Sequence, residues 1–124
     1  MPGLQRVPEQ VGIAVSNIDR SIHWYHDVLG LERAFEEAWG SYPAVLLAGE
    51  TGVALFPTDD DLSATGTFEQ LPHIGFRATG EGYESAKEEL RERRIEFTES
   101  DHTIAGSFYV LDPDGYLVEI TTYD

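Results

Sequence analysis

The two halves of the chain repeat one pattern, and this repeat constrains the fold more than any other feature. The segment QVGIAV at residues 10–15 is echoed by HIGFRA at residues 73–78. Each segment opens an apolar, strand-like run, and a helical pattern and further strands follow it. Each half therefore reads as β-α-β-β-β, and an internal repeat of this kind indicates two similar modules.

Turn residues and apolar periodicity set the expected elements of each module. In the first we expect a helix with Asp19 as its N-cap and Gly30 just beyond its end. The first module is predicted to hold strands at 11–15, 35–39, 44–48 and 53–56 around a helix at 20–29. The second is predicted to hold a strand opening at 73, a helix at 81–93 and strands at 95–98, 107–111 and 116–122.

The chain has the length of one domain, 124 residues. We predict an α+β fold in which a single domain, 1–124, contains two βαβββ modules in tandem. Module one spans about 8–57, a polar linker about 58–72, and module two about 73–124.

Composition excludes several classes of function. The net charge of -15 argues against binding to nucleic acid or to an anionic membrane surface, because the long-range field repels phosphates. The absence of cysteine excludes disulfides and zinc–cysteine sites. The sequence shows no signal-like apolar start and no run of about 18 apolar residues, so we expect a cytoplasmic protein.

The alternation of the last strand predicts a polar site on one face of the sheet. Val118 and Ile120 are apolar enough to pack beneath a helix, so Glu119 should lie on the opposite face. The same parity argument places His73 and Gln10 on that face. Burying a carboxylate and an imidazole is costly unless they are paired. A divalent cation would pair them, and mixed nitrogen and oxygen donors suit zinc or a first-row transition metal; the alternative is a hydrogen-bonded His73–Glu119 pair in a metal-free pocket.

Three segments resemble the vicinal oxygen chelate superfamily, which includes glyoxalase I, extradiol dioxygenases, fosfomycin-resistance transferases and bleomycin-binding proteins. They are QVGIAVSNIDRSIHWYHDVLGL at 10–31, PHIGF at 72–76 and SFYVLDPDGYLVEI at 107–120. The resemblance covers about residues 9–121. It implies a glyoxalase-like fold in which the two modules form a curved eight-stranded mixed sheet, and it implies a homodimer.

The resemblance also implies a set of metal ligands. By position these are Gln10, His73 and Glu119, holding one divalent ion: zinc, iron, manganese or nickel. A fourth position falls on Ala54, which cannot bind a metal, so the site resembles an open three-ligand arrangement more than that of glyoxalase I. Ser107 and Tyr109 stand where fosfomycin transferases keep a serine and a tyrosine around the phosphonate, but Glu99 stands where those proteins keep a lysine.

Arg77, Trp39 and Phe56 complete the predicted substrate site together with Ser107 and Tyr109. Arg77 shares a strand face with His73, and we expect a buried cation whose partner is Glu119 or an anionic substrate. Trp39, Phe56 and Tyr109 either wall the cavity or belong to the core.

Two functions follow from these residues. The first is a metal-dependent lyase, isomerase or dioxygenase acting on a small molecule with vicinal oxygens. In it Glu119 accepts a proton, while Tyr109 and Arg77 position the substrate. The second is a metal-free protein that sequesters a small cationic or aromatic compound, as bleomycin-resistance proteins do.

Overall fold

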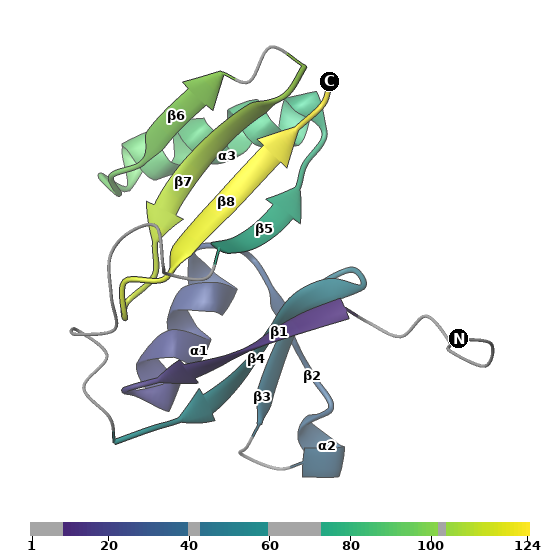
Figure 1. Cartoon of the computed structure of the whole chain (residues 1–124), viewed down its shortest axis with the longest axis vertical. Helices are drawn as coiled ribbons and strands as arrows, with labels where there is room; N and C mark the ends of the chain where they lie inside the picture. The colour runs from purple at the N-terminus through teal and green to yellow at the C-terminus, as the bar shows by residue number, and fades with distance from the viewer. Residues whose placement is uncertain (1–8, 40–42, 60–72, 102–103) are drawn as a thin grey trace, which may run out of the picture. The chain divides into compact units, whose positions relative to one another are not determined.

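A computed structural model describes residues 9–39, 43–59, 73–101 and 104–124. The chain divides into two compact units, Met1–Ala64 and Thr65–Asp124. Each unit holds one four-stranded sheet (Figure 1).

The first unit pairs its first strand with its last. Its elements are β1 (Glu9–Val15), α1 (Ile18–Asp27), β2 (Glu32–Ala34), α2 (Glu36–Trp39), β3 (Ala44–Ala48) and β4 (Thr51–Pro57). The strand order is β1-β4-β3-β2, in which β1 and β4 are parallel and the other pairs are antiparallel.

The second unit has the same topology. Its elements are β5 (His73–Arg77), α3 (Gly80–Glu92), β6 (Thr98–Asp101), β7 (Gly106–Leu111) and β8 (Leu117–Thr122). The order β5-β8-β7-β6, with β5 and β8 parallel, repeats that of the first unit. The predicted α+β class with two tandem modules is therefore confirmed.

The register of the parallel pairs shows how closely the two units correspond. Gly12 of β1 lies opposite Ala54 of β4, and Gly75 of β5 lies opposite Glu119 of β8. Ala54 thus holds in the first sheet the position that Glu119 holds in the second.

One face of each sheet packs against a helix. In the first unit α1 contacts β4, and Tyr25 of α1 is fully buried, as are Val53 and Leu55 of β4. In the second unit α3 lies behind the sheet (Figure 1), and the ring centroids of Tyr83 and Phe108 are 5.2 Å apart. These buried side chains each stabilise the fold by about 1.5–3 kcal/mol.

The buried face of α3 contains a lysine that the apolar pattern did not predict. Apolar periodicity in the sequence predicts a buried stripe of Tyr83, Ala86 and Leu90, but in the structure Lys87 is buried between Tyr83 and Leu90. Its ammonium lies 3.2 Å from a carboxylate oxygen of Glu84. It lies at the same distance from Glu99, which satisfies a charge that would otherwise be costly to bury.

Two predicted strands and one predicted cap are wrong. Residues 35–39 are not a strand, because Phe35 has a φ of 59° and α2 begins at Glu36. Residues 95–97 precede β6 instead of belonging to it, since the amide of Ile95 is held by the Leu90 carbonyl at 2.9 Å. Asn17, and not Asp19, caps α1: its Oδ1 accepts a hydrogen bond from the amide of Arg20 at 3.0 Å.

Candidate functional site

The face of the second sheet opposite α3 carries cross-strand rows of side-chain positions. Residues that are paired across a sheet share a face, so the register alone defines these rows. The first row contains Leu111, Leu117 and His73; the second Thr98, Tyr109, Glu119 and Gly75; the third Ser100, Ser107, Thr121 and Arg77.

Glu119 lies at the centre of a hydrogen-bond network on this face. The Thr121 hydroxyl donates to Oε1 of Glu119 at 2.8 Å, and the hydroxyls of Ser107 and Thr121 are 3.0 Å apart. The Tyr109 hydroxyl closes the network, because it hydrogen-bonds with both Glu119 and Ser107. The side chains of Thr121, Ser107 and Tyr109 therefore hold the half-buried Glu119 carboxylate in one orientation.

Tyr109 enters this network as a proton donor. Burial raises the pKa of its phenol above the usual 10.0, and the hydrogen bond and negative charge of Glu119 raise that pKa further. The phenol consequently stays neutral at physiological pH. Tyr109 can donate a hydrogen bond to Glu119 or to a ligand, but it is not suited to act as a base.

Gly75 leaves an open space next to Glu119. A Cβ added at Gly75 would meet no atom within 4 Å, although Gly75 is the residue directly opposite Glu119. His73 precedes Gly75 by two positions and therefore shares its face of β5. The carboxylate, the open space and the position of His73 fit a bound metal ion, because carboxylate oxygen and imidazole nitrogen are ordinary ligands for zinc and its neighbours.

Gln10, the third predicted ligand, belongs to the first unit. Gln10 is on β1, opposite Gly52 of β4. Its convergence with His73 and Glu119 stays a prediction. Within the part of the chain whose side chains the structure describes, no three His, Asp or Glu side chains cluster suitably for a metal. The side chains of Gln10 and His73 lie outside that part.

The middle row of the corresponding face of the first sheet is small and apolar. It consists of Gly12, Ala54, Val45 and Ala34. Phe56 lies over this row: its exposed fraction is 45%, and a Cβ added at Gly12 would touch its ring at 3.4 Å. Phe56 is thus available to a ligand, as a wall residue must be, whereas the side chain of Trp39 lies outside the described residues.

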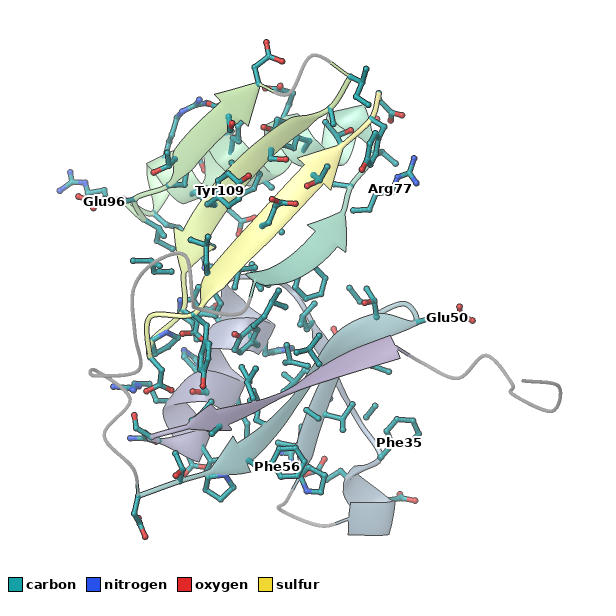
Figure 2. The ribbon with its side chains drawn as sticks, in the orientation of Figure 1. Phe35, Glu50, Phe56, Arg77, Glu96 and Tyr109 are labelled. Carbon is teal, nitrogen blue, oxygen red and sulfur yellow. The ribbon has the colours of Figure 1, made fainter. Side chains whose placement is uncertain are left out.

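Arg77 is exposed, which corrects the prediction of a buried cation. Its guanidinium lies 4.6 Å from the centroid of the Tyr123 ring, so an aromatic ring supports it. Figure 2 shows Arg77 at the end of β5 and Tyr109 over the middle of the sheet. Sequence reasoning missed Tyr123 because it follows the last predicted strand, where no alternation marks it.

Glu99 does not face this network. It pairs with Phe108, whose side chain is buried on the helix side, and its carboxylate contacts Lys87 and Arg91 at 3.2 and 3.5 Å. The absence of a lysine at this position therefore says nothing about anion binding beside Glu119.

A cavity of about 690 Å³ adjoins the network. Tyr109 lines it, as does Leu117, the residue opposite His73. The complete lining is Ile95, Glu96, Phe97, Thr98, Tyr109, Leu111 and Leu117. One sequence signal indicates this cavity: strand alternation puts Leu111 and Leu117 on the Glu119 face. Residues 95–97, which the sequence predicts as part of a strand, line the cavity from the loop before β6.

Comparison with known proteins agrees with this fold. Residues 8–120 match the sequence profile of the Glyoxalase/Bleomycin resistance protein/Dioxygenase superfamily. The glutathione transferase FosA of Serratia marcescens is 26% identical over 108 residues, which cover 87% of this chain and 74% of that protein.

Two solved structures show the same architecture. A glyoxalase/dioxygenase from Nostoc punctiforme has a TM-score of 0.78 at 20% identity, covering 100% of this chain and 95% of that one. A lactoylglutathione lyase from Agrobacterium tumefaciens has a TM-score of 0.72 at 19% identity, covering 98% and 96%. The chain belongs to the glyoxalase/bleomycin resistance/dioxygenase superfamily. No helix in the described ranges is long and apolar enough to cross a membrane.

Proposed function

We propose that the protein is a divalent-metal-dependent enzyme that acts on a small molecule with vicinal oxygens, as a lyase, isomerase or dioxygenase. Gln10, His73 and Glu119 are the proposed ligands. The observation that supports this most is the Glu119 carboxylate, which two hydroxyl donors orient beside the open space at Gly75. A bound divalent ion would supply Lewis-acid stabilisation of negative charge on a substrate oxygen.

The residues of the second sheet have distinct proposed roles. Thr121 and Ser107 hold Glu119 in position, as the outer partners of metal ligands generally do. Tyr109, kept neutral by its raised pKa, donates a hydrogen bond to a substrate oxygen. Glu119 accepts a proton if it is released from its ligand role. Arg77, on its exposed strand end, positions the substrate.

The first module is proposed to contribute an open coordination position and apolar contacts with the substrate. Ala54 replaces the fourth ligand and is 4% exposed, so the proposed set keeps open positions for a bidentate substrate. Phe56 and Trp39 are proposed to contact the apolar part of the substrate. A homodimer and a cytoplasmic location stay expectations.

A metal-free sequestration protein is the second candidate, and the hydrogen-bond network supports it. Tyr109 and Thr121 already satisfy the Glu119 carboxylate, so its half-buried charge is stabilised without a cation. A protein of this kind would bind its ligand in the apolar cavity and leave it unchanged.

Metal stoichiometry distinguishes the two candidates. The protein, stripped with a chelator and titrated with Zn²⁺, Mn²⁺ or Ni²⁺, is expected to bind one ion per chain. His73→Ala and Glu119→Gln should each weaken binding about tenfold or more, since each removes a ligand and outer-partner changes alone cost about that much. Glu92→Gln on the exposed end of α3 is the matched control and should bind as the parent does. If circular dichroism shows both ligand variants folded and their metal affinity is unchanged, the enzyme proposal is wrong.

A further inference from the structure

The cavity beside Tyr109 has apolar walls and one charged group. Ile95, Phe97, Leu111 and Leu117 form the walls, and Leu111 is 58% exposed although it is a large apolar side chain. Thr98 and Tyr109 supply hydroxyls. Its volume of about 690 Å³ lies within the range of roughly 300–1,000 Å³ that is typical of small-molecule sites.

The charge of this cavity is negative. Glu96 is the one ionisable carboxylate in the described lining, which contains no arginine, lysine or histidine. Glu96 is exposed, and it lies at the β6 edge of the sheet, away from Arg77 (Figure 2). In the described ranges no basic side chain forms an ion pair with it.

Two basic residues of α3, Lys87 and Arg91, are engaged by other carboxylates. Arg91 lies 5.4 Å from the ring centroid of Phe97, and its guanidinium contacts Glu99 at 3.5 Å. Lys87 contacts Glu84 and Glu99, each at 3.2 Å. None of the described residues that line the cavity is basic, and residues 73–124 as a whole carry twelve acidic and five basic side chains.

From these observations we infer that the cavity binds the apolar, positively charged part of a ligand, namely an amine carried on an aromatic or branched aliphatic body. The body packs against Leu111, Leu117 and Phe97, where burial of apolar surface stabilises it. The ammonium lies at Glu96, and the field of the second unit favours it over a carboxylate.

This inference gives the substrate class for the proposed enzyme, and it rests on that function only for the chelating end of the molecule. Tyr109 links the two regions, because it lines the cavity and also hydrogen-bonds with Glu119. A ligand that fills the cavity thus reaches the carboxylate with its oxygen-bearing end. Binding of the amine end itself requires no metal.

Three probes that share a phenyl group on a short alkyl chain but differ in charge test the inference. Calorimetric or NMR titration of the metal-free, full-length protein would compare 3-phenylpropylamine, 3-phenylpropanol and 3-phenylpropionate. The amine is expected to bind about two- to fivefold more tightly than the alcohol, the range of a solvent-exposed charge pair, and the carboxylate most weakly. Chemical-shift changes should centre on Leu111, Leu117 and Thr98.

Two variants separate charge from packing. Glu96→Gln should abolish the preference for the amine over the alcohol, while the matched control Glu92→Gln should retain it. Leu111→Ser, at an exposed position that tolerates a polar residue, should weaken the amine and the alcohol alike. Preferential binding of the carboxylate, an amine preference that persists in Glu96→Gln, or no binding of any probe at millimolar concentration would each overturn the inference.

The same titrations distinguish this inference from the proposed function. If the metal site is absent, the amine still binds and the metal titration fails. If the cavity inference is wrong, Zn²⁺ binding at His73 and Glu119 is unaffected while the three probes show no charge preference.

Discussion

At the scale of single residues, the site depends on how one carboxylate is held. Glu119 receives hydrogen bonds from Thr121 and Tyr109, and the single proton of the Ser107 hydroxyl can be donated to either of these two hydroxyls in turn. Ser107 is 1% exposed, so its hydroxyl has little access to water and its hydrogen bonds stay within the network. The carboxylate is therefore fixed in direction before any ligand arrives, which is what a metal or substrate site requires.

The raised pKa of Tyr109 makes a prediction about alkaline stability. The unfolded phenol loses its proton near pH 10, while the folded phenol keeps it to higher pH. The stabilising contribution of Tyr109 is thus complete below about pH 10 and is lost as pH rises through the folded pKa. In urea unfolding at pH 9 and pH 11, Tyr109→Phe should lose less free energy of unfolding between the two pH values than the parent does.

Tyr83 and Lys87 also have raised pKa values, so their stabilising contributions are likewise lost as pH rises. The Tyr109→Phe variant should therefore still lose part of its free energy of unfolding between pH 9 and pH 11. Burial is the first cause for Tyr83; for Lys87 burial opposes the shift, and the hydrogen bonds to Glu99 and Glu84 outweigh it. An identical decline in parent and variant would show that Tyr109 is not held in the network.

At the scale of elements, α3 is attached to its sheet by a buried lysine as well as by apolar side chains. The Lys87 side chain is 9% exposed, whereas its partners Glu84 and Glu99 are 70% and 46% exposed. Water screens ion pairs of this kind, and each contributes little. The ammonium lies 4.7 Å from the centroid of the Tyr83 ring, and we expect the burial of the aliphatic stem that carries it to contribute more.

Substitution of Lys87 tests whether its aliphatic stem stabilises the fold more than its ion pairs do. Lys87→Met keeps the stem volume, and we expect a change in the free energy of unfolding below about 1 kcal/mol. Lys87→Ala also removes the packing and should cost about 2 kcal/mol or more. Thermal and urea unfolding of the two variants measure the difference. Equal destabilisation by methionine and alanine would mean that the ion pairs outweigh the packing.

The sequence predicted the elements with strong periodicity and missed those set by local backbone conformation. Residues 44–48 were predicted as a strand and form one, because a run of buried apolar residues between turn signals has few alternatives. Residues 35–39 were misread because the left-handed conformation of Phe35 ends β2 early, and a non-glycine residue seldom signals this. Residues 95–97 were misread because Arg94, also at positive φ, keeps the chain near the end of α3.

The candidate site was predictable to a similar extent. Strand parity puts Glu119 opposite the helix side, and the register of β7 with β8 brings Tyr109 and Ser107 to the same face. The hydrogen-bond network could not be predicted, because it depends on the cross-strand register of side chains that are far apart in sequence. Neither could the exposure of Arg77, whose partner Tyr123 lies beyond the last strand.

At the scale of the whole molecule, the repeat has diverged in chemistry while keeping its topology. The two sheets have the same strand order, and Ala54 and Glu119 occupy corresponding positions. In its middle row the first sheet keeps the small and apolar residues Gly12, Ala54, Val45 and Ala34, where the second sheet keeps Tyr109 and Glu119. We expect this division to assign metal and proton chemistry mainly to the second module, and apolar contact with the substrate to the first.

The central claim is that Gln10, His73 and Glu119 hold one ion between them. A crystal of the protein loaded with Co²⁺ or Ni²⁺, measured at the absorption edge of the metal, tests it most directly through the anomalous difference map. We predict one strong peak per chain, with a Gln10 amide oxygen, a His73 ring nitrogen and a Glu119 carboxylate oxygen each about 2.0–2.2 Å away. An ion bound elsewhere, or Gln10 outside the coordination sphere of a peak at His73 and Glu119, would contradict the claim.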